Sequence, residues 1–387
     1  MIGLALSFIA APVIFFGYAY VGYPVLLRLM VLRRPPARDY DDPVEWPVVT
    51  IAVPCFNEEK RIRWTLESVL AIDYPAASLQ VLVVSDASTD GTDDIVAEYG
   101  SRFGVELLRL PARMGKTAAE NAALEAARGE IVVNLDASVR ILPNSIKELV
   151  RAFQDPSVGV VSSCDVSTGS SRAEGNQGES GYVGYEMWVR ELETRMGSIV
   201  GASGSFFGIR RGIHEPGFPE ALSRDFASAL MAREKGYRSV SAPDVVCLVP
   251  RTPSLHAEFH RKIRTMARGL ETLWYKRQLM NPIRYGSFAW MLVSHKLCRW
   301  LAYLALPLGF AGLVLLALQS RFALWLLAVT LLGIAAGIVG MSWPDGRHVP
   351  KIFAMPGFAL ASNLAGVLAW ARVLRGKRSP IWQPTRR

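Results

Sequence analysis

Aspartates at the ends of apolar runs have the chemistry of a binding or catalytic site. Asp86 follows the run LQVLVVS, Asp136 ends the run IVVNLD, and Asp225 comes later in the sequence SRDF. A carboxylate at a strand end can accept hydrogen bonds from ribose hydroxyls, hold a divalent cation or take a proton as a general base. An isolated aspartate there is more often a turn or cap residue, but several on one sheet edge favour a functional site.

A basic segment, HRKIRTMARG, supplies the opposite charge. Its cations Arg261, Lys262 and Arg264 could neutralise a bound anion. The segment also has the pattern of a cationic amphipathic helix on a membrane surface, and the two interpretations are compatible. Four histidines are expected to be solvated or interfacial, without a firm ligand role: His214, His256, His260 and His295.

Other motifs of catalysis are missing from the sequence. The string RMGKT would need a glycine at Leu110 to complete a phosphate-binding P-loop. There is no G-x-G-x-x-G after a strand, no G-x-S-x-G and no H-E-x-x-H, so nicotinamide binding and the corresponding hydrolases have no support. The cysteines (Cys55, Cys164, Cys247, Cys298) are widely separated without a C-x-x-C pair, which argues against zinc and for reduced thiols.

Strands and helices alternate from residue 48 to residue 140. The runs VTIAVPCF, LQVLVVSD, VELLRL and GEIVVNLD predict strands, and the segments between them predict helices. This alternation predicts an α/β fold, with a mostly parallel sheet covered by helices on both faces. Ligands bind at the carboxyl ends of such strands, which is where Asp86 and Asp136 stand.

The second half of this domain extends to about residue 284. A Gly- and Ser-rich stretch over residues 162–184 predicts a mobile loop. The segment GYEMWVRELETR predicts a helix, and GASGSFFG predicts a backbone turn.

Apolar runs flank the domain. The chain is 51% hydrophobic and only 20% charged, below the ~25% of soluble domains. Residues 2–27, 300–320, 322–344 and 352–371 contain no Asp, Glu, Lys or Arg, and each run approaches or exceeds the ~20 residues that span a bilayer. Residues 285–294 predict an interfacial helix that ends at His295, Lys296 and Arg299. The chain is therefore predicted to be a membrane protein with a soluble middle.

The net charge of +9 gathers beside the apolar runs, at residues 28–38 and 372–387. Such clusters are typical of cytoplasmic anchors that attract anionic lipids, so membrane lipids are expected partners and nucleic acid is not. Three crossings after a cytoplasmic domain would leave the basic tail outside. We therefore expect residues 352–371 to be re-entrant or interfacial; the alternative is a fourth crossing that includes residues 285–298.

These features together resemble family 2 glycosyltransferases with a GT-A fold. The resemblance rests on VTIAVPCFNEEKRI, LQVLVVSDASTDGT, RMGKTAAENAAL and GEIVVNLDAS, followed in order by GASGSFFGIRR, SRDF and RKIRT. It covers about residues 48–270 and is similar to the membrane-embedded hyaluronan, chitin and poly-N-acetylglucosamine synthases. The resemblance implies inverting transfer of a sugar from a nucleotide diphosphate donor, with a UDP-sugar expected, to a glycan or lipid-linked acceptor.

The same resemblance implies roles for individual residues. Asp225 corresponds to the catalytic base, and Asp136 to the first acid of the family's D-x-D motif. The nucleotide sugar would be bound by Pro54, Asn57, Glu58, Asp86, Arg113, Lys116 and Asp136. The leaving diphosphate would be neutralised by Arg261, Lys262 and Arg264.

The sequence departs from the family pattern in three places. Ser138 replaces the second acid of D-x-D, so the Mg²⁺ or Mn²⁺ ion expected at Asp136 and Ser138 would either bind more weakly or recruit another residue such as His256. Arg224 stands where an acid usually precedes the catalytic aspartate. Thr265 replaces the tryptophan of processive synthases, so we expect transfer of one or a few sugars.

The predicted organisation is a transmembrane helix (1–33), a linker (34–47), a cytoplasmic GT-A domain (48–284), interfacial and transmembrane helices (285–374) and a basic cytoplasmic tail (375–387). The domain divides into a nucleotide-binding half (48–140) and an acceptor half (141–284). We expect a multi-pass protein of the bacterial inner membrane that acts in surface polysaccharide synthesis. The alternatives are a glycolipid synthase with a lipid acceptor, or a non-catalytic nucleotide-sugar-binding subunit of an exporter.

Overall fold

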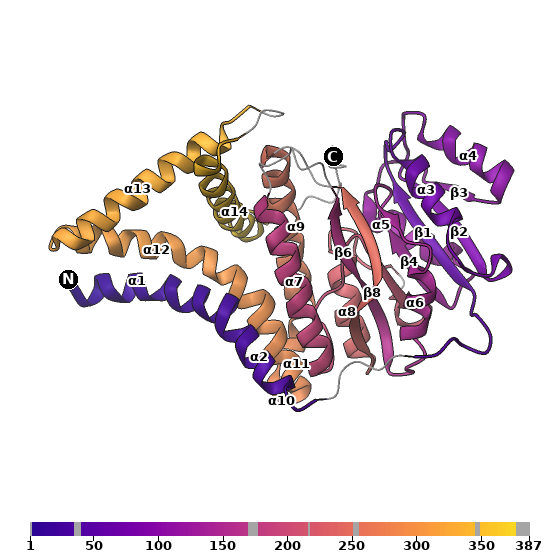
Figure 1. Cartoon of the computed structure of the whole chain (residues 1–387), viewed down its shortest axis with the longest axis horizontal. Coiled ribbons are helices and arrows are strands. Elements are labelled where there is room, and N and C mark those ends of the chain that lie inside the picture. Colours follow the sequence, from indigo (N-terminus) through magenta and orange to yellow (C-terminus); the bar gives the residue numbers. More distant parts are fainter. Residues whose placement is uncertain are drawn as a thin grey trace.

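A computed structural model of the chain describes residues 2–34, 40–168, 177–215, 217–250, 255–344 and 349–376. Figure 1 shows an α/β domain built on one sheet, and a group of long helices that extend away from it. The long helices come from both ends of the sequence, so the first and last parts of the chain build the same region.

One mixed sheet organises the domain. Its order is β3-β2-β1-β4-β7-β6-β8-β5. The strands β1 to β4 pair in parallel, as do β6 and β8, whereas β7 runs antiparallel between β4 and β6. The predicted α/β fold with a mostly parallel sheet is confirmed. The strands are β1 (Val49–Cys55), β2 (Leu79–Ser85), β3 (Glu106–Arg109), β4 (Ile131–Leu135), β5 (Arg140–Ile141), β6 (Val158–Thr168), β7 (Phe206–Arg210) and β8 (Arg238–Pro250).

Helices cover both faces of the sheet. The helices α3 (Ile62–Leu70), α4 (Thr92–Phe103) and α6 (Ser145–Ala152) form one apolar core with it. On the other face, α5 (Lys116–Ala126) and α8 (Arg224–Glu234) form a second core. The central strands β1 and β4 are buried along their whole length, which explains why their sequences are continuous apolar runs.

The stretch 162–184 is more ordered than its composition predicts. Strand β6 continues to Thr168, and helix α7 begins at Gln177 and ends at Met196. The prediction of one mobile loop is therefore wrong for both ends of this stretch, and residues 169–176 lie outside the described part of the chain. The strand is stabilised by long pairing with β8, a tertiary effect that local glycine content does not reveal.

Four helices are long and apolar enough to cross a membrane, among the residues that the structure describes. The first runs without a break through α1 (Ile2–Gly17), the π-helical turn η1 (Tyr18–Gly22) and α2 (Tyr23–Val31). The second joins α11 (Ser287–Leu292), the π-helical turn η6 (Val293–Cys298) and α12 (Arg299–Ala317). The others are α13 (Arg321–Met341) and α14 (Lys351–Leu374). These helices indicate membrane association.

The stretch 285–294 does not form the separate interfacial helix that its sequence predicts. Two short elements, η5 (Arg277–Met280) and α10 (Pro282–Tyr285), precede it, and from Ser287 onward the chain is helical to Ala317. The cations expected to end an interfacial helix lie inside this long helix instead, and His295 is only 2% exposed.

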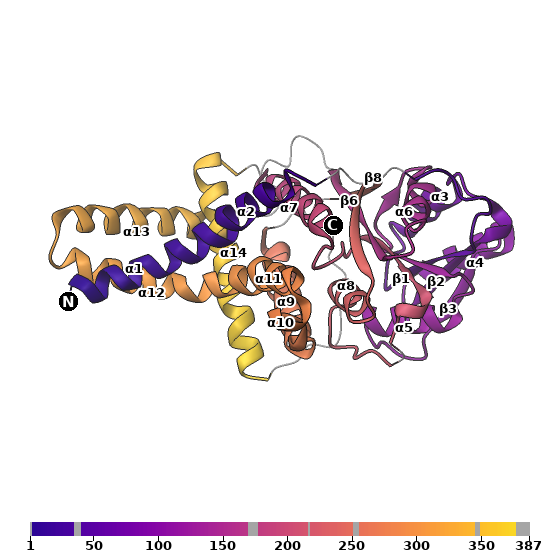
Figure 2. The same cartoon turned by 90° about the horizontal axis from the view of Figure 1, so that it is seen from below.

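Helix α14 differs in direction from the other long helices. Figure 2 shows α12 and α13 running alongside one another with α1 over them, while α14 runs across them. It packs on α13, on α12 and on α9 (Leu255–Tyr275) of the α/β domain. Its apolar window is 33% buried, against 11–17% for the other three helices. The expectation that residues 352–371 are re-entrant or interfacial stays a prediction, since α14 is also long and apolar enough to cross.

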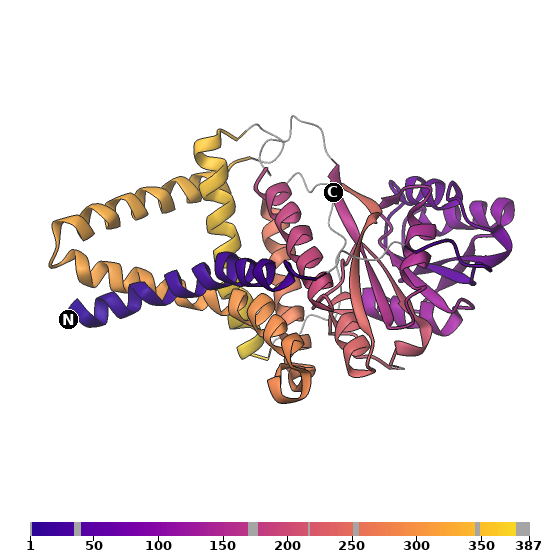
Figure 3. The same ribbon diagram turned by 60° about the horizontal axis from the view of Figure 1, so that its bottom comes forward.

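A buried polar cluster joins the long helices to the domain. The ring nitrogens of His295 lie 2.6 Å from a carboxylate oxygen of Glu193 and 2.9 Å from one of Glu186. Arg299 donates to Glu186 (2.8 Å), and the Tyr23 hydroxyl donates to Glu193 (2.6 Å). Both glutamates belong to α7, which lies against the end of the N-terminal helix (Figure 3). The expectation of a solvated or interfacial His295 is therefore wrong.

Candidate active site

The loops after β1 and β2 hold each other in place. Asn57 has a φ of 53°. Its side-chain Oδ1 accepts a hydrogen bond from the backbone amide of Thr89 (2.8 Å), and its backbone amide donates to Ser88 Oγ (3.1 Å). The amide of Glu58 donates to Thr92 Oγ1 (2.8 Å). Asn57 is one of the residue types that tolerate a left-handed backbone at low cost. The two loops form one rigid edge of the sheet.

Asp86 stands at the end of β2 and is 2% exposed. Its carboxylate accepts hydrogen bonds from the amides of Met114 (2.7 Å) and Gly115 (2.8 Å). Gly115 has a φ of 100°, a conformation that favours glycine, and it immediately precedes Lys116 at the start of α5. Asp86 therefore fixes the loop that delivers Lys116, and it is not among the residues that line the neighbouring cavity.

A cavity of about 290 Å³ opens at the carboxyl ends of β1 and β4. Its other walls come from α5, from the turn before β7, from the first turn of α8 and from α9. The lining residues are Pro54, Glu58, Lys116, Thr117, Glu120, Asp136, Ala137, Ser138, Asp165, Arg190, Ser203, Gly204, Ser205, Ser223, Arg224, Asp225, Arg261, Arg264, Thr265 and Arg268. Asp136 and Asp225, which are far apart in sequence, thus face one space.

Lys116 and Asp136 form an ion pair inside this cavity. The Lys116 ammonium donates to Asp136 Oδ1 (2.5 Å) and to the carbonyl of Gly204 (3.0 Å), and it lies 3.7 Å from the Glu120 carboxylate. Burial lowers the pKa of Lys116, but the nearby carboxylates of Asp136 and Glu120 outweigh it and raise the pKa above its ordinary value. Lys116 is therefore a fixed positive charge in the cavity.

Asp225 lies in the first turn of α8, where the helix end favours a negative charge. Ser223 donates to its Oδ1 (2.5 Å). A Cβ atom at Gly204 would lie 2.7 Å from the other carboxylate oxygen, so the turn can approach Asp225 only with glycine at this position. The carboxylate is thus held beside the same turn whose carbonyl binds Lys116.

One face of α9 forms a basic wall. Arg261, Arg264, Thr265 and Arg268 follow the spacing of one helical face, and all of them line the cavity. Arg261 makes a bidentate pair with Glu258, whose two oxygens lie 2.8 Å from Nε and Nη2. Burial, together with the other arginines, lowers the pKa of Arg264 below its ordinary value, as expected where cations gather for an anion.

Some predicted site residues lie away from the cavity. Lys262 points to α14, where its ammonium donates to Ser362 Oγ (2.8 Å) and stands 3.9 Å from the Phe358 ring centre. Lys262 was expected to bind the diphosphate, but in the structure it connects α9 to α14. Asn57 and Arg113 are also not among the lining residues; the Arg113 guanidinium stacks 3.9 Å above the ring of Phe56.

The donor atoms do not fit the divalent cation predicted at Asp136 and Ser138. Both residues line the cavity, but one oxygen of Asp136 binds the Lys116 ammonium, and a hydroxyl is a weak ligand for a hard cation. His256, the additional ligand considered, is not among the lining residues and lies against His260, with 3.2 Å between their Nε2 atoms. Within the described ranges, no group of three or more His, Cys, Asp or Glu side chains could hold a metal ion.

Sequence reasoning missed Glu120, Asp165 and Arg190, which also line the cavity. Asp165 stands on β6 and accepts hydrogen bonds from Ser203 Oγ (2.6 Å), and Arg190 stands on α7. Asp165 belongs to the stretch expected to be a loop, and Arg190 to the segment GYEMWVRELETR expected to be a helix, so no strand-end signal marked either residue. Glu120 follows Lys116 by one helical turn, a spacing that could have indicated their pairing.

Arg224, which replaces the family's usual acid, is fully buried beside the cavity. Its guanidinium donates to Nδ1 of His214 (2.7 Å) and lies 3.9 Å from Glu120. Burial and the neighbouring charge of Arg224 lower the pKa of His214 to about 3, so the ring is neutral and accepts this hydrogen bond. His214 is 7% exposed, and the expectation of a solvated or interfacial histidine is therefore wrong.

Comparison with known proteins agrees with this geometry. Residues 50–218 match the family model described as Glycosyl transferase family 2. The chain carries a family 2 glycosyltransferase domain. The matched range begins at β1 and ends before α8, so it contains Lys116 and Asp136 and stops short of Asp225. The predicted family is thus confirmed, while the particular resemblance to hyaluronan and chitin synthases remains a prediction.

Relatives of the family 2 domain have several substrates. An N-acetylglucosaminyltransferase from Rhizobium sp. (strain N33) is 25% identical over 248 residues, which cover 59% of this chain and 54% of that protein. A beta-monoglucosyldiacylglycerol synthase from Nostoc sp. is 27% identical over 187 residues, covering 47% and 40%. A dodecaprenyl-phosphate galacturonate synthase from Rhizobium johnstonii is 33% identical over 132 residues, covering 32% and 39%. The chain thus spans about half the length, or less, of these relatives.

A solved structure matches almost the whole chain. It is the mannosyltransferase PcManGT from Pyrobaculum calidifontis in complex with GDP-Man and Mn²⁺, with a TM-score of 0.75 and 26% identity. The match covers 97% of this chain and 99% of that one, so it includes the long apolar helices as well as the family 2 domain.

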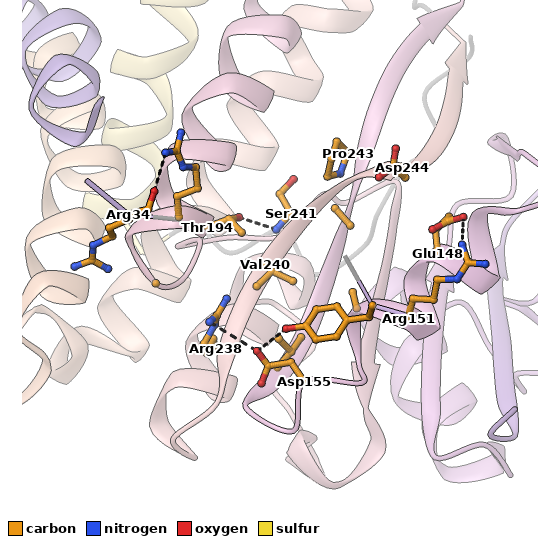
Figure 4. Close-up of a pocket in the computed structure, with 16 residues that line it drawn as sticks. Arg34, Glu148, Arg151, Asp155, Thr194, Arg238, Val240, Ser241, Pro243 and Asp244 are labelled. Atoms are coloured by element: carbon orange, nitrogen blue, oxygen red, sulfur yellow. Dashed lines mark hydrogen bonds and ion pairs between the residues drawn. The ribbon is translucent and has the colours of Figure 1, made fainter. Parts of the chain in front are cut away.

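A second cavity, of about 560 Å³, lies at the opposite edge of the sheet, where Val158 begins β6 and Arg238 begins β8 (Figure 4). Its cations face oxygen atoms of the protein: Arg195 donates to the carbonyl of Arg34 (3.3 Å), and Arg238 lies 3.8 Å from Asp155. None of the predicted site residues lines it. The predicted site residues that line a cavity are therefore at the smaller one.

Proposed function

We propose that the protein is an inverting glycosyltransferase that moves a sugar from a nucleotide diphosphate donor to a hydroxyl group of a membrane-anchored glycan or lipid acceptor. One observation carries the proposal: Asp225 lines the same cavity, at the carboxyl edge of the sheet, as Lys116 and Asp136 of the family 2 domain. This is the edge at which open α/β sheets bind nucleotides.

Asp225 is the proposed catalytic base. It takes the proton of the acceptor hydroxyl while that oxygen attacks the anomeric carbon of the donor sugar. The new bond joins the acceptor oxygen to the anomeric carbon, and the bond from that carbon to the diphosphate breaks. The electron pair leaves with the nucleoside diphosphate, and the attack from the opposite side inverts the anomeric centre. Asp225 then holds the proton.

The leaving diphosphate gains negative charge, and the cations of the cavity stabilise it. Lys116 stands at one wall, and Arg261, Arg264 and Arg268 stand at the α9 wall. Asp136 is proposed to bind the ribose and the donor through its free oxygen. Asp86 does not contact the donor in this proposal; its carboxylate orients the loop before Lys116.

A membrane-anchored acceptor is supported by the position of α9. The helix that supplies the basic wall packs directly on α14, which crosses the long apolar helices. Lys262 and Ser362 connect the two helices. A glycan or lipid held in the membrane could therefore reach the cavity from the α14 side. We further propose that the domain and the basic tail face the cytoplasm of a bacterial inner membrane, where nucleotide sugars are made.

The first test replaces the proposed base. In full-length protein in lipid nanodiscs, Asp225→Asn is expected to lower sugar transfer at least a thousandfold while the affinity for UDP changes by less than about threefold, because a base is lost and a nucleotide contact is not. Transfer is measured with radiolabelled sugars from a panel of UDP- and GDP-linked donors. A matched control is Asp94→Asn, which removes an exposed acid from the first turn of α4.

Turnover by Asp225→Asn at the rate of the unaltered protein would remove Asp225 from this role. Absence of transfer from every donor, despite tight UDP binding, would instead support the non-catalytic binding subunit. The acceptor is identified by partition of the product. Label extracted into organic solvent indicates a lipid or lipid-linked glycan, and label in a water-soluble polymer contradicts the membrane-anchored acceptor.

A further inference from the structure

The position of Lys116 resembles that of a bound cation more than that of an ordinary surface lysine. Its ammonium contacts acceptors from three elements: Asp136 at the end of β4 (2.5 Å), the carbonyl of Gly204 in the turn before β7 (3.0 Å), and Glu120 one helical turn further along α5 (3.7 Å). The side chain is only 20% exposed. Carboxylate and carbonyl oxygens converging on one positive centre are the arrangement that proteins offer to hard metal ions.

The loop before α5 holds this ammonium in place. Both oxygens of the buried Asp86 accept backbone amides of that loop, from Met114 and Gly115. Gly115 adopts a φ of 100°, which turns the chain sharply into the helix. Lys116 is the first residue of α5, so its side chain starts from a fixed backbone. The positive charge is thus preorganised and needs little rearrangement during a reaction.

The D-x-D pair has only one carboxylate in this chain, because position 138, two residues after Asp136, is a serine. One oxygen of Asp136 already binds Lys116, and the Glu120 carboxylate lies beside the same ammonium. Among the described residues, no group of three or more His, Cys, Asp or Glu side chains could hold a metal ion. The α9 wall adds the guanidinium groups of Arg264 and Arg268 to the cavity. The charge that a divalent ion would supply is present as side chains.

We propose that Lys116 takes the place of the divalent cation in this site, so that sugar transfer proceeds without a bound metal ion. This inference rests on the proposed function. The Lys116 ammonium donates hydrogen bonds to the diphosphate oxygens and keeps its proton throughout. The proton of the acceptor goes to Asp225, and the electron pair of the broken bond leaves with the nucleoside diphosphate.

The test measures nucleotide binding and transfer in parallel, with the full-length protein in nanodiscs and with either EDTA or Mn²⁺ present. EDTA is expected to change the affinity for UDP and GDP, and the transfer rate, by less than twofold. Lys116→Met is expected to weaken nucleotide binding at least tenfold and transfer at least a hundredfold, with Lys116→Arg retaining part of both. Lys147→Met, on α6 and outside the cavity lining, is the matched control, because its side chain is 23% exposed against 20% for Lys116.

A gain-of-metal variant sharpens the test. In the double variant Lys116→Met with Ser138→Asp, Mn²⁺ is expected to restore nucleotide binding, and electron paramagnetic resonance should detect bound Mn²⁺ that the unaltered protein lacks. Tenfold or greater loss of nucleotide affinity in EDTA, restored by Mn²⁺, would overturn the inference. So would failure of UDP and GDP to bind at all. Metal-independent binding that needs Lys116, without transfer from any donor, would support Lys116 in place of the cation at the nucleotide site but reject the proposed function.

Discussion

At the scale of single residues, the closeness of Gly204 to Asp225 has a testable consequence. A Cβ atom at residue 204 would lie 2.7 Å from a carboxylate oxygen of Asp225, so Gly204→Ala must displace either the turn or the proposed base. We expect kcat to fall about a hundredfold, since misplacement by about 1 Å can cost that much, while the KM for the donor changes little. Gly212→Ala, where a Cβ meets nothing within 4 Å, is the control. Equal kcat values for the two variants would contradict this geometry.

Asp136 and Lys116 line the cavity for different reasons. Parallel strands end at a common edge, which places Asp136, after β4, at that edge. Lys116 is expected only from the family resemblance, and the sheet order puts β2 and β1 between β4 and β3, the strand that precedes α5. Helical periodicity explains the failure for Lys262. Arg261 and Arg264 are three residues apart and face the cavity, whereas Lys262 is rotated by about 100° and faces α14. The motif alone does not state which face of α9 is buried.

At the scale of elements, α7 connects the family 2 domain to the long helices. Glu193→Ala would leave the Tyr23 hydroxyl and Nδ1 of His295 without their buried partner, while Nε2 of His295 keeps Glu186. Breaking a buried pair by removing one member costs about 3–5 kcal/mol. We expect a clear decrease in the thermal unfolding temperature in detergent, with Glu191→Ala, an exposed acid of the same helix, nearly unchanged. Equal unfolding temperatures would show that this cluster does not stabilise the contact.

The cluster also explains why residues 285–298 were difficult to predict. A group of titratable side chains within five residues is typical of a helix that leaves the membrane interior, and this segment contains His295, Lys296 and Arg299. In the folded chain Glu186 and Glu193, about a hundred positions earlier, face these groups, so the helix continues through them. Such compensation between distant segments is not visible in a local window of sequence.

At the scale of the whole molecule, the helix directions define a topology. If α1–α2, α12 and α13 cross the membrane and α14 lies along its surface, the domain and the end of α14 share one side. Gln319→Cys, in the turn between α12 and α13, should then react with an impermeant maleimide in intact cells. Arg375→Cys should react only after permeabilisation. Labelling of Arg375→Cys in intact cells would mean that α14 also crosses.

The apolar runs predict the existence of all four long helices, and the alternation of strands and helices predicts the sheet. The direction of α14 is beyond such reasoning, because it depends on close contacts between helices. A Cβ atom at Gly340 would lie 2.2 Å from the carbonyl oxygen of Phe353, so α13 and α14 approach closely at this glycine. Crossing geometry of this kind depends on small residues of both helices.

Helix α9 turns its arginines toward the cavity and packs on α14. A change in bilayer thickness or lateral pressure that shifts α14 would therefore be transmitted to the groups that stabilise the departing phosphates. Lipid composition would then set the turnover rate mechanically, even for a donor that never enters the lipid phase.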